Sequence, residues 1–299
     1  MDLYNELPDR LLFAVPKKGR LYERCLALLE GADIQFHRKN RLDIALVTNL
    51  PLALVFLPAA DIPAFVASGN VELGITGQDM VAESQLEGKV QVVCELGFGK
   101  CRLCVQTPTK GAVRTVEDLV GKRVVTSFEN LAKNFFDKLE KAQGGAGGKT
   151  EITYVSGSVE AACALGLADG IVDLVESGET MKAAGLTDVA TLLTSQAVLI
   201  QRHSPKHPEL VNKIASRIRG VIAASRYVYC DYNIERKNLE RAVKLTPGRQ
   251  APTISSLEEE GWVAVSSMVL KDDIAQVMDG LEGIGARDIL VFNISNCRV

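Results

Sequence analysis

The chain has 299 residues, 47% of them hydrophobic and 24% charged, and its formal net charge is −3. This length predicts about two domains with sizeable cores, and the slightly acidic balance excludes a general basic field that would attract nucleic acid or anionic membranes. Residues 1–6 lack the basic start of a signal peptide, and no apolar run approaches the ~20 residues of a membrane span, so we expect a cytoplasmic protein.

The chain up to about residue 100 alternates between strand-like and helix-like patterns. A cationic turn with Lys17 and Arg20 follows the first strand; it either holds an anion or only carries solvated charges. Asp61 is placed to cap a later helix, and Gly77 and Asp79 stand where the last strand of this part enters another helix. The alternation predicts an α/β lobe with a site at the carboxyl ends of its strands. The expected strands are 11–15, 43–47, 52–57 and 71–75, and the expected helices begin at 21 and 62.

The alternation restarts near residue 103 and predicts a second α/β lobe. Cys101 and Cys104 form a C-x-x-C pair, but the pair lies in an extended segment and has no second pair to complete a zinc site. We therefore interpret the scattered cysteines as small buried hydrophobic residues. The expected strands are 103–106, 123–126, 152–155, 171–175, 189–195 and 198–201, and the expected helices are 131–141, 159–167 and 208–224.

From about residue 227 the order of predicted strands and helices changes. Strands are expected at 227–231, 252–257, 262–268 and 288–294, with helices at 234–244 and 272–283. This is the β-α-β-β-α-β order of a ferredoxin-like module. Such an appended module more often regulates or assembles a protein than catalyses its reaction.

The stretch 160–181 carries the most informative chemistry. A buried strand at 171–175 contains Asp173, and the loop after it contains Glu176, Ser177 and Thr180 before a helix that Gly185 ends. Backbone N–H groups and hydroxyls of such a loop suit a phosphate, whereas the two acids suit sugar hydroxyls or a cation. A phosphorylated ribose satisfies both features. The alternative is an ordinary strand-to-helix turn with solvated acids.

This loop, read with its flanks, closely resembles the signature of the ATP phosphoribosyltransferase family. The resemblance extends to 14–21, 61–63, 74–79 and 156–160, and to 246–248, 251–254 and 284–286, so it covers nearly the whole chain and is most similar to the fungal long form. One position departs: Pro58 stands where many relatives have Arg. The matching signature residues are Glu160, Gly166, Ala168, Ile171, Asp173, Ser177, Gly178, Thr180 and Met181.

The resemblance implies a fold and an activity. The fold would have two lobes like those of type II periplasmic binding proteins, formed by 1–100 with 196–224 and by 101–195, and a ferredoxin-like regulatory domain at 225–299. The enzyme would transfer the 5-phosphoribosyl group of phosphoribosyl pyrophosphate (PRPP) to N1 of ATP, releasing pyrophosphate, with Mg²⁺ required. Histidine would inhibit this first step of histidine biosynthesis, and the chain would form dimers and hexamers.

The resemblance also implies roles for particular residues. Cations such as Lys17 and Arg20 would stabilise the leaving group or the ATP phosphates, and Glu160 is a further catalytic candidate. Gly77, Asp79 and Ser158 are additional candidates for substrate binding, and no residue is assigned to a metal. The PRPP loop would comprise Asp173, Leu174, Val175, Glu176, Ser177, Gly178, Glu179 and Thr180, and a histidine pocket would include Asp231, Thr253 and Ala286. Two other hypotheses stay open: a two-lobed binding or sensor protein, and a phosphoribosyltransferase acting on another base.

Overall fold

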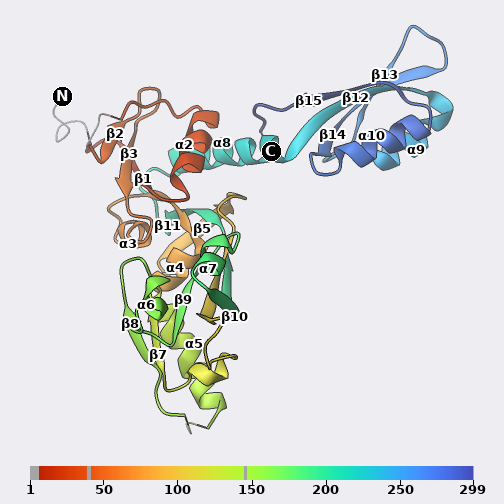
Figure 1. Cartoon of the computed structure of the whole chain (residues 1–299). Coiled ribbons are helices and arrows are strands. Elements are labelled where there is room, and N and C mark those ends of the chain that lie inside the picture. Colours follow the sequence, from red (N-terminus) through yellow and green to blue (C-terminus); the bar gives the residue numbers. More distant parts are fainter. Residues whose placement is uncertain (1–6, 39–41, 145–146, 299) are drawn as a thin grey trace. The chain divides into compact units, whose positions relative to one another are not determined.

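This computed structural model describes residues 7–38, 42–144 and 147–298 (Figure 1). Residues 1–6, which bear on the expectation about secretion, lie outside the described residues. The chain forms two compact units: one contains the described residues up to Ala27 together with 34–211, and the other contains 28–33 and the chain from Asn212 onward. No helix among the described residues is long and apolar enough to cross a membrane.

The first lobe contains a six-stranded sheet in the order β2-β3-β1-β4-β11-β5. Its first strand is a continuous apolar run, Leu-Leu-Phe-Ala-Val-Pro, which is almost wholly buried because helices and loops cover both faces. The strands are β1 (Leu11–Pro16), β2 (Ile44–Leu46), β3 (Leu52–Leu57), β4 (Leu73–Gly77), β5 (Val90–Glu95) and β11 (Ala197–Arg202), and the helices are α2 (Tyr22–Gly31), α3 (Ile62–Ala67) and α4 (Gln78–Ser84).

The second lobe contains a five-stranded sheet in the order β10-β6-β9-β7-β8. Its helix α5 (Glu129–Ala142) is amphipathic, and Ala132 and Phe136 are buried against the sheet while its charged residues face solvent. The strands are β6 (Cys101–Pro108), β7 (Arg123–Thr126), β8 (Glu151–Tyr154), β9 (Gly170–Val175) and β10 (Leu186–Ser195), and the shorter helices are η1 (Glu117–Leu119), α6 (Ala161–Ala164) and α7 (Glu179–Ala183).

The two lobes share one topology. In the first, β3, β1 and β4 are parallel, and the antiparallel β11 separates them from β5. In the second, β8, β7 and β9 are parallel, and the antiparallel β6 separates them from β10. The chain crosses between the lobes twice, from β5 to β6 and from β10 to β11, so each antiparallel strand is the first to enter its sheet after a crossing. This is the arrangement of type II periplasmic binding proteins, and the predicted fold class is confirmed.

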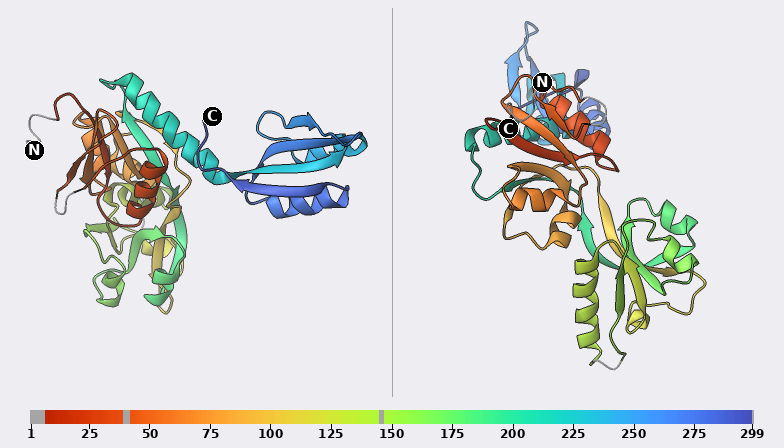
Figure 2. Two further views of the ribbon diagram at one scale, coloured as in Figure 1. Left: turned by 90° about the horizontal axis from the view of Figure 1, so that it is seen from above. Right: turned by 90° about the vertical axis from the view of Figure 1, so that its left-hand side faces the viewer.

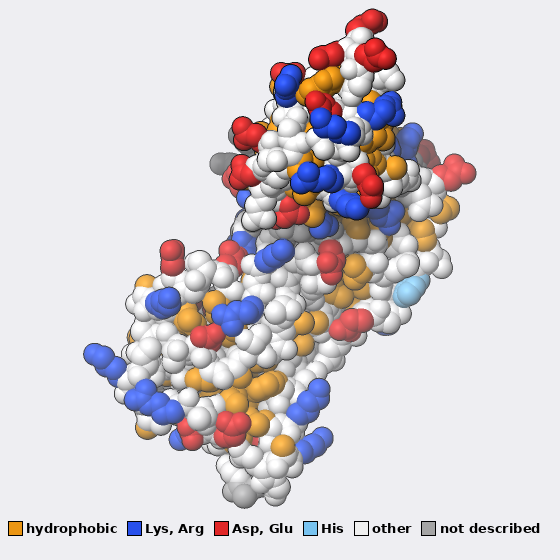
Figure 3. Space-filling model, turned by 90° about the vertical axis from the view of Figure 1, so that its right-hand side faces the viewer, with side chains coloured by type: hydrophobic (Ala, Val, Ile, Leu, Met, Phe, Trp, Pro, Cys, Tyr) orange, Lys and Arg blue, Asp and Glu red, His pale blue; other side chains and the backbone are white. Residues whose placement is uncertain are grey.

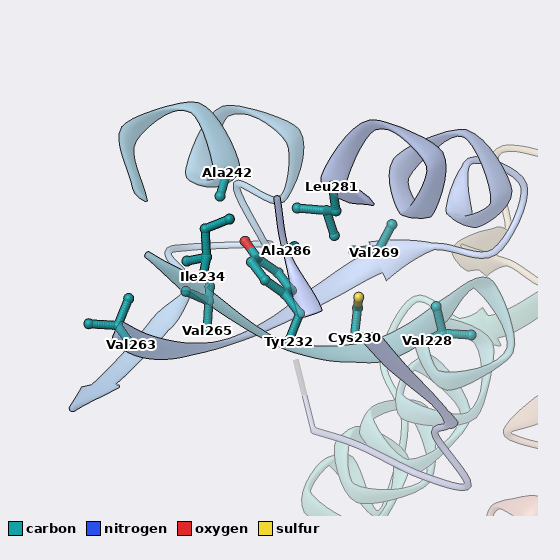
Figure 4. Close-up of a cluster of buried hydrophobic side chains, with 10 residues drawn as sticks. All are labelled: Val228, Cys230, Tyr232, Ile234, Ala242, Val263, Val265, Val269, Leu281 and Ala286. Atoms are coloured by element: carbon teal, nitrogen blue, oxygen red, sulfur yellow. The ribbon is translucent and has the colours of Figure 1, made fainter. Parts of the chain in front are cut away.

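The C-terminal module has four antiparallel strands in the order β13-β14-β12-β15, with helices α9 and α10 on one face of the sheet (Figure 2). Alternate residues of β12 and β14 are buried under these helices (Figure 4). The hydroxyl of Tyr232, in that core, lies 2.7 Å from Thr246 Oγ1, which satisfies both polar groups. The helix α8 (Pro208–Arg226) leads into the module, whose elements are β12 (Tyr227–Glu235), η2 (Arg236–Asn238), α9 (Leu239–Leu245), β13 (Thr253–Ser256), β14 (Trp262–Leu270), α10 (Ile274–Gly283) and β15 (Arg287–Asn293). The predicted ferredoxin-like order is confirmed.

Several local predictions were wrong. The strand β12 runs on to Glu235, so Ile234 is a buried strand residue rather than the start of a helix; its alternating burial outweighs the helical pattern that follows it. The helix expected at 159–167 is only the single turn of α6, and β5 was not predicted. Asp61 occupies the N-cap position of α3 but makes no side-chain capping hydrogen bond.

The prediction about the cysteines is confirmed for four of them: Cys25, Cys101, Cys104 and Cys230 are buried and free of disulfides.

Candidate active site at the junction of the lobes

The predicted PRPP loop follows β9, and its backbone is shaped by a glycine. Gly178 has φ +82°, a left-handed conformation that residues with a Cβ rarely adopt, and α7 begins directly after it. Because α7 has only five residues, its dipole contributes little, and anion binding here would depend on the backbone N–H groups and two hydroxyls. The Ser177 hydroxyl accepts the Glu179 N–H at 3.4 Å, and the side chains of Ser177, Glu179 and Thr180 are exposed.

Asp173 is a half-buried carboxylate at the base of this loop. Burial raises the pKa of Asp173 to about 6; the Leu174 N–H, which donates to Asp173 Oδ1 at 2.8 Å, opposes this shift, and the nearby negative charge of Glu160 adds to it. At neutral pH the Asp173 carboxylate is therefore mostly ionised and can accept hydrogen bonds from sugar hydroxyls. The Leu174 side chain packs against the hydrophobic core of the second lobe, whereas the buried Val175 side chain lies in the wall of a hollow at the carboxyl end of β9.

The loop after β8 reaches the same edge of the sheet, because β7, β8 and β9 are parallel and their carboxyl ends lie side by side. Ser158 in this loop has φ +52°, a strained backbone conformation for a residue other than glycine. Its carbonyl accepts the Ala161 N–H at 3.1 Å, and Glu160, at the N-cap position of α6, is half-buried. The structure thus brings Ser158, Glu160 and Asp173 to one edge of the second lobe.

Arg20 connects the first lobe to this edge. Its guanidinium donates to the Gly99 carbonyl at 2.5 Å, in the crossing between β5 and β6. It also lies 3.5 Å from Glu176 Oε1 in the second lobe and 3.6 Å from Asp79 Oδ2 in the first. Arg20 therefore makes one close hydrogen bond and two looser ion pairs, one to each lobe.

Asp79, in the first turn of α4, is 1% exposed. Its Oδ1 accepts the Ser195 hydroxyl at 2.6 Å, and the Ser195 Oγ accepts the Asp79 N–H at 3.0 Å. Gly77 contacts this carboxylate directly, because a Cβ built at Gly77 would lie 2.0 Å from Asp79 Oδ1. Gly77 therefore makes room for Asp79 rather than offering a group to a ligand.

A hollow of about 590 Å³ opens beside these groups at the junction of the lobes. Its surface is about half polar, and its wall carries a lysine, an arginine and two glutamates, which suits a charged ligand better than a purely apolar one. Its lining residues are Gln78, Glu95, Lys100, Cys101, Arg102, Val175, Glu176, Thr194, Ser195 and Gln196. A second hollow of about 570 Å³ lies at the amino ends of the strands of the first lobe, where His207 Nδ1 lies 2.7 Å from the buried Glu72 carboxylate.

Lys17 lies apart from the Arg20 cluster. Its ammonium is 3.7 Å from Asp43 Oδ2, and its backbone N–H donates to the Leu57 carbonyl, on the β2–β3 side of the sheet. Pro58, at the position where many relatives have Arg, follows β3 at the same carboxyl edge. The sequence placed Lys17 and Arg20 in one turn, but their partners are different acids.

The helix α4 also fastens the lobes together. The Glu83 carboxylate accepts the backbone N–H groups of Asn130 and Leu131 at 2.8 and 3.0 Å, at the first turn of α5. Burial raises the pKa of Glu83, and these two hydrogen bonds oppose that shift. Met80, from the same helix, packs against the core of the second lobe.

Two of the three predicted histidine-pocket residues lie in one cross-strand row of the C-terminal module. Ser266 of β14 pairs with Asp231 of β12 on one side and with Thr253 of β13 on the other, and its hydroxyl donates to Asp231 Oδ1 at 2.5 Å. Ala286 is buried in the core beneath the helices, so its side chain does not join this row. A hollow of about 410 Å³ beside the row is lined by Thr253, Ser266 and the two cations Arg249 and Arg298.

Sequence reasoning missed Ser195, Ser266 and Glu83. No motif singles out these residues, because each acts on a group far away in the chain; Ser195 and Asp79 are 116 positions apart. Among the residues that the structure describes, no group of three or more His, Cys, Asp or Glu side chains is arranged to hold a metal ion. On the face drawn in Figure 3, acidic and basic side chains are intermixed, in keeping with the small net charge.

The fold defines the class of the protein: two α/β lobes of the type II periplasmic-binding-protein kind, with a candidate site at their junction, and a ferredoxin-like module. The family description "ATP phosphoribosyltransferase" matches residues 58–220, and "HisG, C-terminal domain" matches residues 224–296. The chain belongs to the ATP phosphoribosyltransferase family.

Full-length relatives agree with this assignment. The chain is 61% identical over 302 residues to an ATP phosphoribosyltransferase of Yarrowia lipolytica and 56% identical over 302 residues to one of Saccharomyces cerevisiae, with 100% of each chain covered. A solved structure, the ATP phosphoribosyl transferase (HisG:HisZ) complex from Thermotoga maritima, is 22% identical with a TM-score of 0.61 and covers 72% of this chain and 98% of that chain. That likeness supports the fold of the matched part.

Proposed function

We propose that this ATP phosphoribosyltransferase joins PRPP to N1 of ATP, giving N1-(5-phosphoribosyl)-ATP and pyrophosphate, as the first step of histidine biosynthesis. The observation that carries the proposal is the position of the 173–180 loop, whose Glu176 pairs with Arg20 across the junction of the lobes. A loop with two hydroxyls and two acids suits a phosphorylated sugar, and a cation from the facing lobe suits its pyrophosphate.

Different residues of the loop bind different parts of PRPP. The N–H groups of 177–180 with the Ser177 and Thr180 hydroxyls hold the 5-phosphate, and Asp173 and Glu176 accept from the ribose hydroxyls. The negative charge of Glu160 acts on Asp173, and we assign Glu160 to the same end of the site as the ribose. Gly178 fixes the turn of the loop, and Glu179 extends outward from it.

The reaction displaces pyrophosphate from the anomeric carbon of the ribose by adenine N1. Negative charge grows on the departing oxygens, and Arg20 neutralises it from the facing lobe, with Lys17 contributing to the longer-range field. Adenine N1 is already a nucleophile, so no protein base is assigned. The lobes contribute mainly by holding two polyanions in line, which removes much of the entropic barrier.

Mg²⁺ supplies positive charge to the pyrophosphate of PRPP when it is bound. The donor set fits this ion, since Asp173, Glu176 and Glu160 offer the hard oxygen ligands that Mg²⁺ prefers. Within the described ranges these acids do not form a three-ligand cluster, which suits an ion held largely by substrate oxygens and water.

The C-terminal module, 225–299, is the proposed regulatory domain. Asp231 would take the amino group of a histidine, and Thr253 and the backbone near Ala286 would take its other polar groups. The two lobes, 1–100 with 196–224 and 101–195, remain the proposed catalytic domains, in a cytoplasmic homo-oligomer that binds neither nucleic acid nor membrane. Inhibition at this distance requires histidine and the substrates to favour different global states.

The deciding assay incubates the protein with ATP, PRPP and Mg²⁺ and follows pyrophosphate release together with the absorbance change of the adenine ring. Omission of each substrate is the matched control. Replacing ATP by adenine or orotate tests for a phosphoribosyltransferase acting on another base. Tight binding of one ligand without turnover would instead identify a two-lobed binding protein and refute the proposed activity.

A further inference from the structure

Arg20 faces two acids of very different exposure, in addition to the Gly99 carbonyl. The Glu176 side chain is 52% exposed, whereas the Asp79 side chain is 1% exposed, although both lie about equally far from the guanidinium. An exposed acid on a loop can turn away at little cost, and a buried one cannot. When a ribose engages Glu176, Arg20 therefore keeps Asp79 as its counter-ion.

The Asp79 carboxylate is asymmetric. Its Oδ1 accepts the Ser195 hydroxyl, whereas its Oδ2 accepts no hydrogen bond from any described residue and lies 3.6 Å from the guanidinium of Arg20. A buried carboxylate oxygen without a donor is costly unless a cation faces it. This oxygen is therefore one of the groups that hold the Arg20 guanidinium, together with the Gly99 carbonyl that accepts its hydrogen bond.

Ser195 fixes that orientation. It donates to Asp79 Oδ1 at 2.6 Å and accepts the Asp79 N–H at 3.0 Å, so the serine and the aspartate form a closed two-bond ring. Ser195 is the last residue of β10 and stands at the second crossing between the lobes. The next residue, Gln196, makes two more bonds: its carbonyl accepts the Gln78 N–H at 3.0 Å, and its N–H donates to Gln78 Oε1 at 3.2 Å. Together with the two bonds between Ser195 and Asp79, four hydrogen bonds join this crossing to the start of α4.

We propose that Ser195 is a positioning residue for phosphoribosyl transfer: it holds the Asp79 carboxylate so that Oδ2 keeps the Arg20 guanidinium at the pyrophosphate end of the site. This proposal rests on the proposed function, because Arg20 must act on the substrate's phosphates. Ser195 touches neither substrate in this mechanism. It acts through Asp79, and Asp79 acts through Arg20.

The test compares wild type, Ser195→Ala, Asp79→Asn and the double variant, with Ser84→Ala as the matched control. Ser84 lies on α4, the helix that carries Asp79. Its hydroxyl also makes a 2.6 Å hydrogen bond, but it donates to the Val81 carbonyl within that helix. Turnover is measured as pyrophosphate release, and binding is measured by calorimetry with pyrophosphate and Mg²⁺ as the probe. The thermal unfolding midpoint of each variant is measured first, and all assays are then run at a temperature at which every variant is folded.

Ser195→Ala is expected to lower kcat/KM for PRPP and the affinity for pyrophosphate, each by roughly 10- to 100-fold, the loss typical of a hydrogen bond to a charged group. The same substitution in the Asp79→Asn background is expected to have less than a threefold further effect, because the carboxylate that it orients is already gone. Ser84→Ala should match wild type.

Two outcomes overturn the proposal. In the first, the Ser195→Ala protein binds pyrophosphate as tightly as wild type does. In the second, Ser195→Ala lowers the pyrophosphate affinity equally in the wild-type and Asp79→Asn backgrounds, which indicates that the serine is purely structural. A wild-type protein without turnover would refute the proposed function alone, since the pyrophosphate measurements still decide the role of Ser195. An Arg20→Ala protein supplies a second readout, because exogenous guanidinium should restore its pyrophosphate binding, and Ser195→Ala should raise the guanidinium concentration required.

Discussion

Replacing Gly77 by Ala places a methyl group where the Asp79 carboxylate lies. The new Cβ would be 2.0 Å from Asp79 Oδ1 and 3.0 Å from its Cγ, so the side chain must leave its position. The backbone itself accepts alanine, because Gly77 has φ −84° and ψ 149°. The whole effect of the substitution therefore comes from displacing Asp79.

The magnitude follows from two terms. Overpacking of a filled site costs typically ~1–3 kcal/mol, and loss of the hydrogen bond between the Ser195 hydroxyl and the carboxylate costs ~1.5–3 kcal/mol. We expect the free energy of unfolding to fall by about 2.5–6 kcal/mol, the sum of these two terms, measured by denaturant titration. Activity should fall by at least the roughly 10-fold that the second term alone implies.

Gly88→Ala is the matched control, because nothing lies within 4 Å of a Cβ at that position. Gly77→Ala combined with Asp79→Ala should be more stable than the sum of the two single changes predicts, since the clash disappears with the carboxylate. A Gly77→Ala protein as stable and active as Gly88→Ala would refute this account of how Asp79 is held.

Three further predictions concern the loop and the C-terminal module. Thr180→Ala should weaken PRPP binding by roughly 1–3 kcal/mol with ATP binding unchanged, measured by calorimetry; equal PRPP affinity would contradict its role at the phosphate. Asp173 has a folded pKa of about 6, above its unfolded value, so the folded state binds the proton more tightly and stability falls as pH rises between the two values. Asp173→Asn should therefore stabilise the protein by up to roughly 3 kcal/mol at pH 7.5 but not at pH 4. Wild-type activity should fall below pH 6, where the carboxylate becomes protonated. A difference in unfolding free energy between the two proteins that does not change with pH would refute the raised pKa of Asp173. Asp231→Ala should leave turnover intact and weaken inhibition by histidine, with Asn233→Ala as the control on the same strand; unaltered inhibition would remove Asp231 from the pocket.

The sequence was most informative where local pattern and burial agree. Buried strands such as Leu52–Leu57 are short apolar runs flanked by turn residues, and the loop after Val175 was recognisable from its acids, hydroxyls and glycine. Ile234 shows the limit of this reasoning, because a strand end followed by charged residues has the same pattern as a helix start. The edge strand β5 was missed because much of it is exposed, so it lacks the apolar run that reveals a central strand.

The positions that assemble the site were beyond sequence reasoning for a different physical reason. The bonds between Ser195 and Asp79 depend on the register of two sheets and on where the chain crosses between them, neither of which local spacing encodes. Lys17 illustrates the converse case: adjacency to Arg20 in the sequence placed both in one turn, yet Lys17 pairs with Asp43 on another part of the sheet.

The short helix α4 has a mechanical consequence. Its last turn is fastened to the second lobe through Glu83, and its first turn carries Asp79, whose carboxylate faces Arg20. A change in the angle between the lobes that shifts the first turn of α5 would therefore also pull on the helix that carries the Arg20 counter-ion. The angle between the lobes is in this way coupled through α4 to the position of the carboxylate that faces Arg20, alongside the two chain crossings that join the lobes.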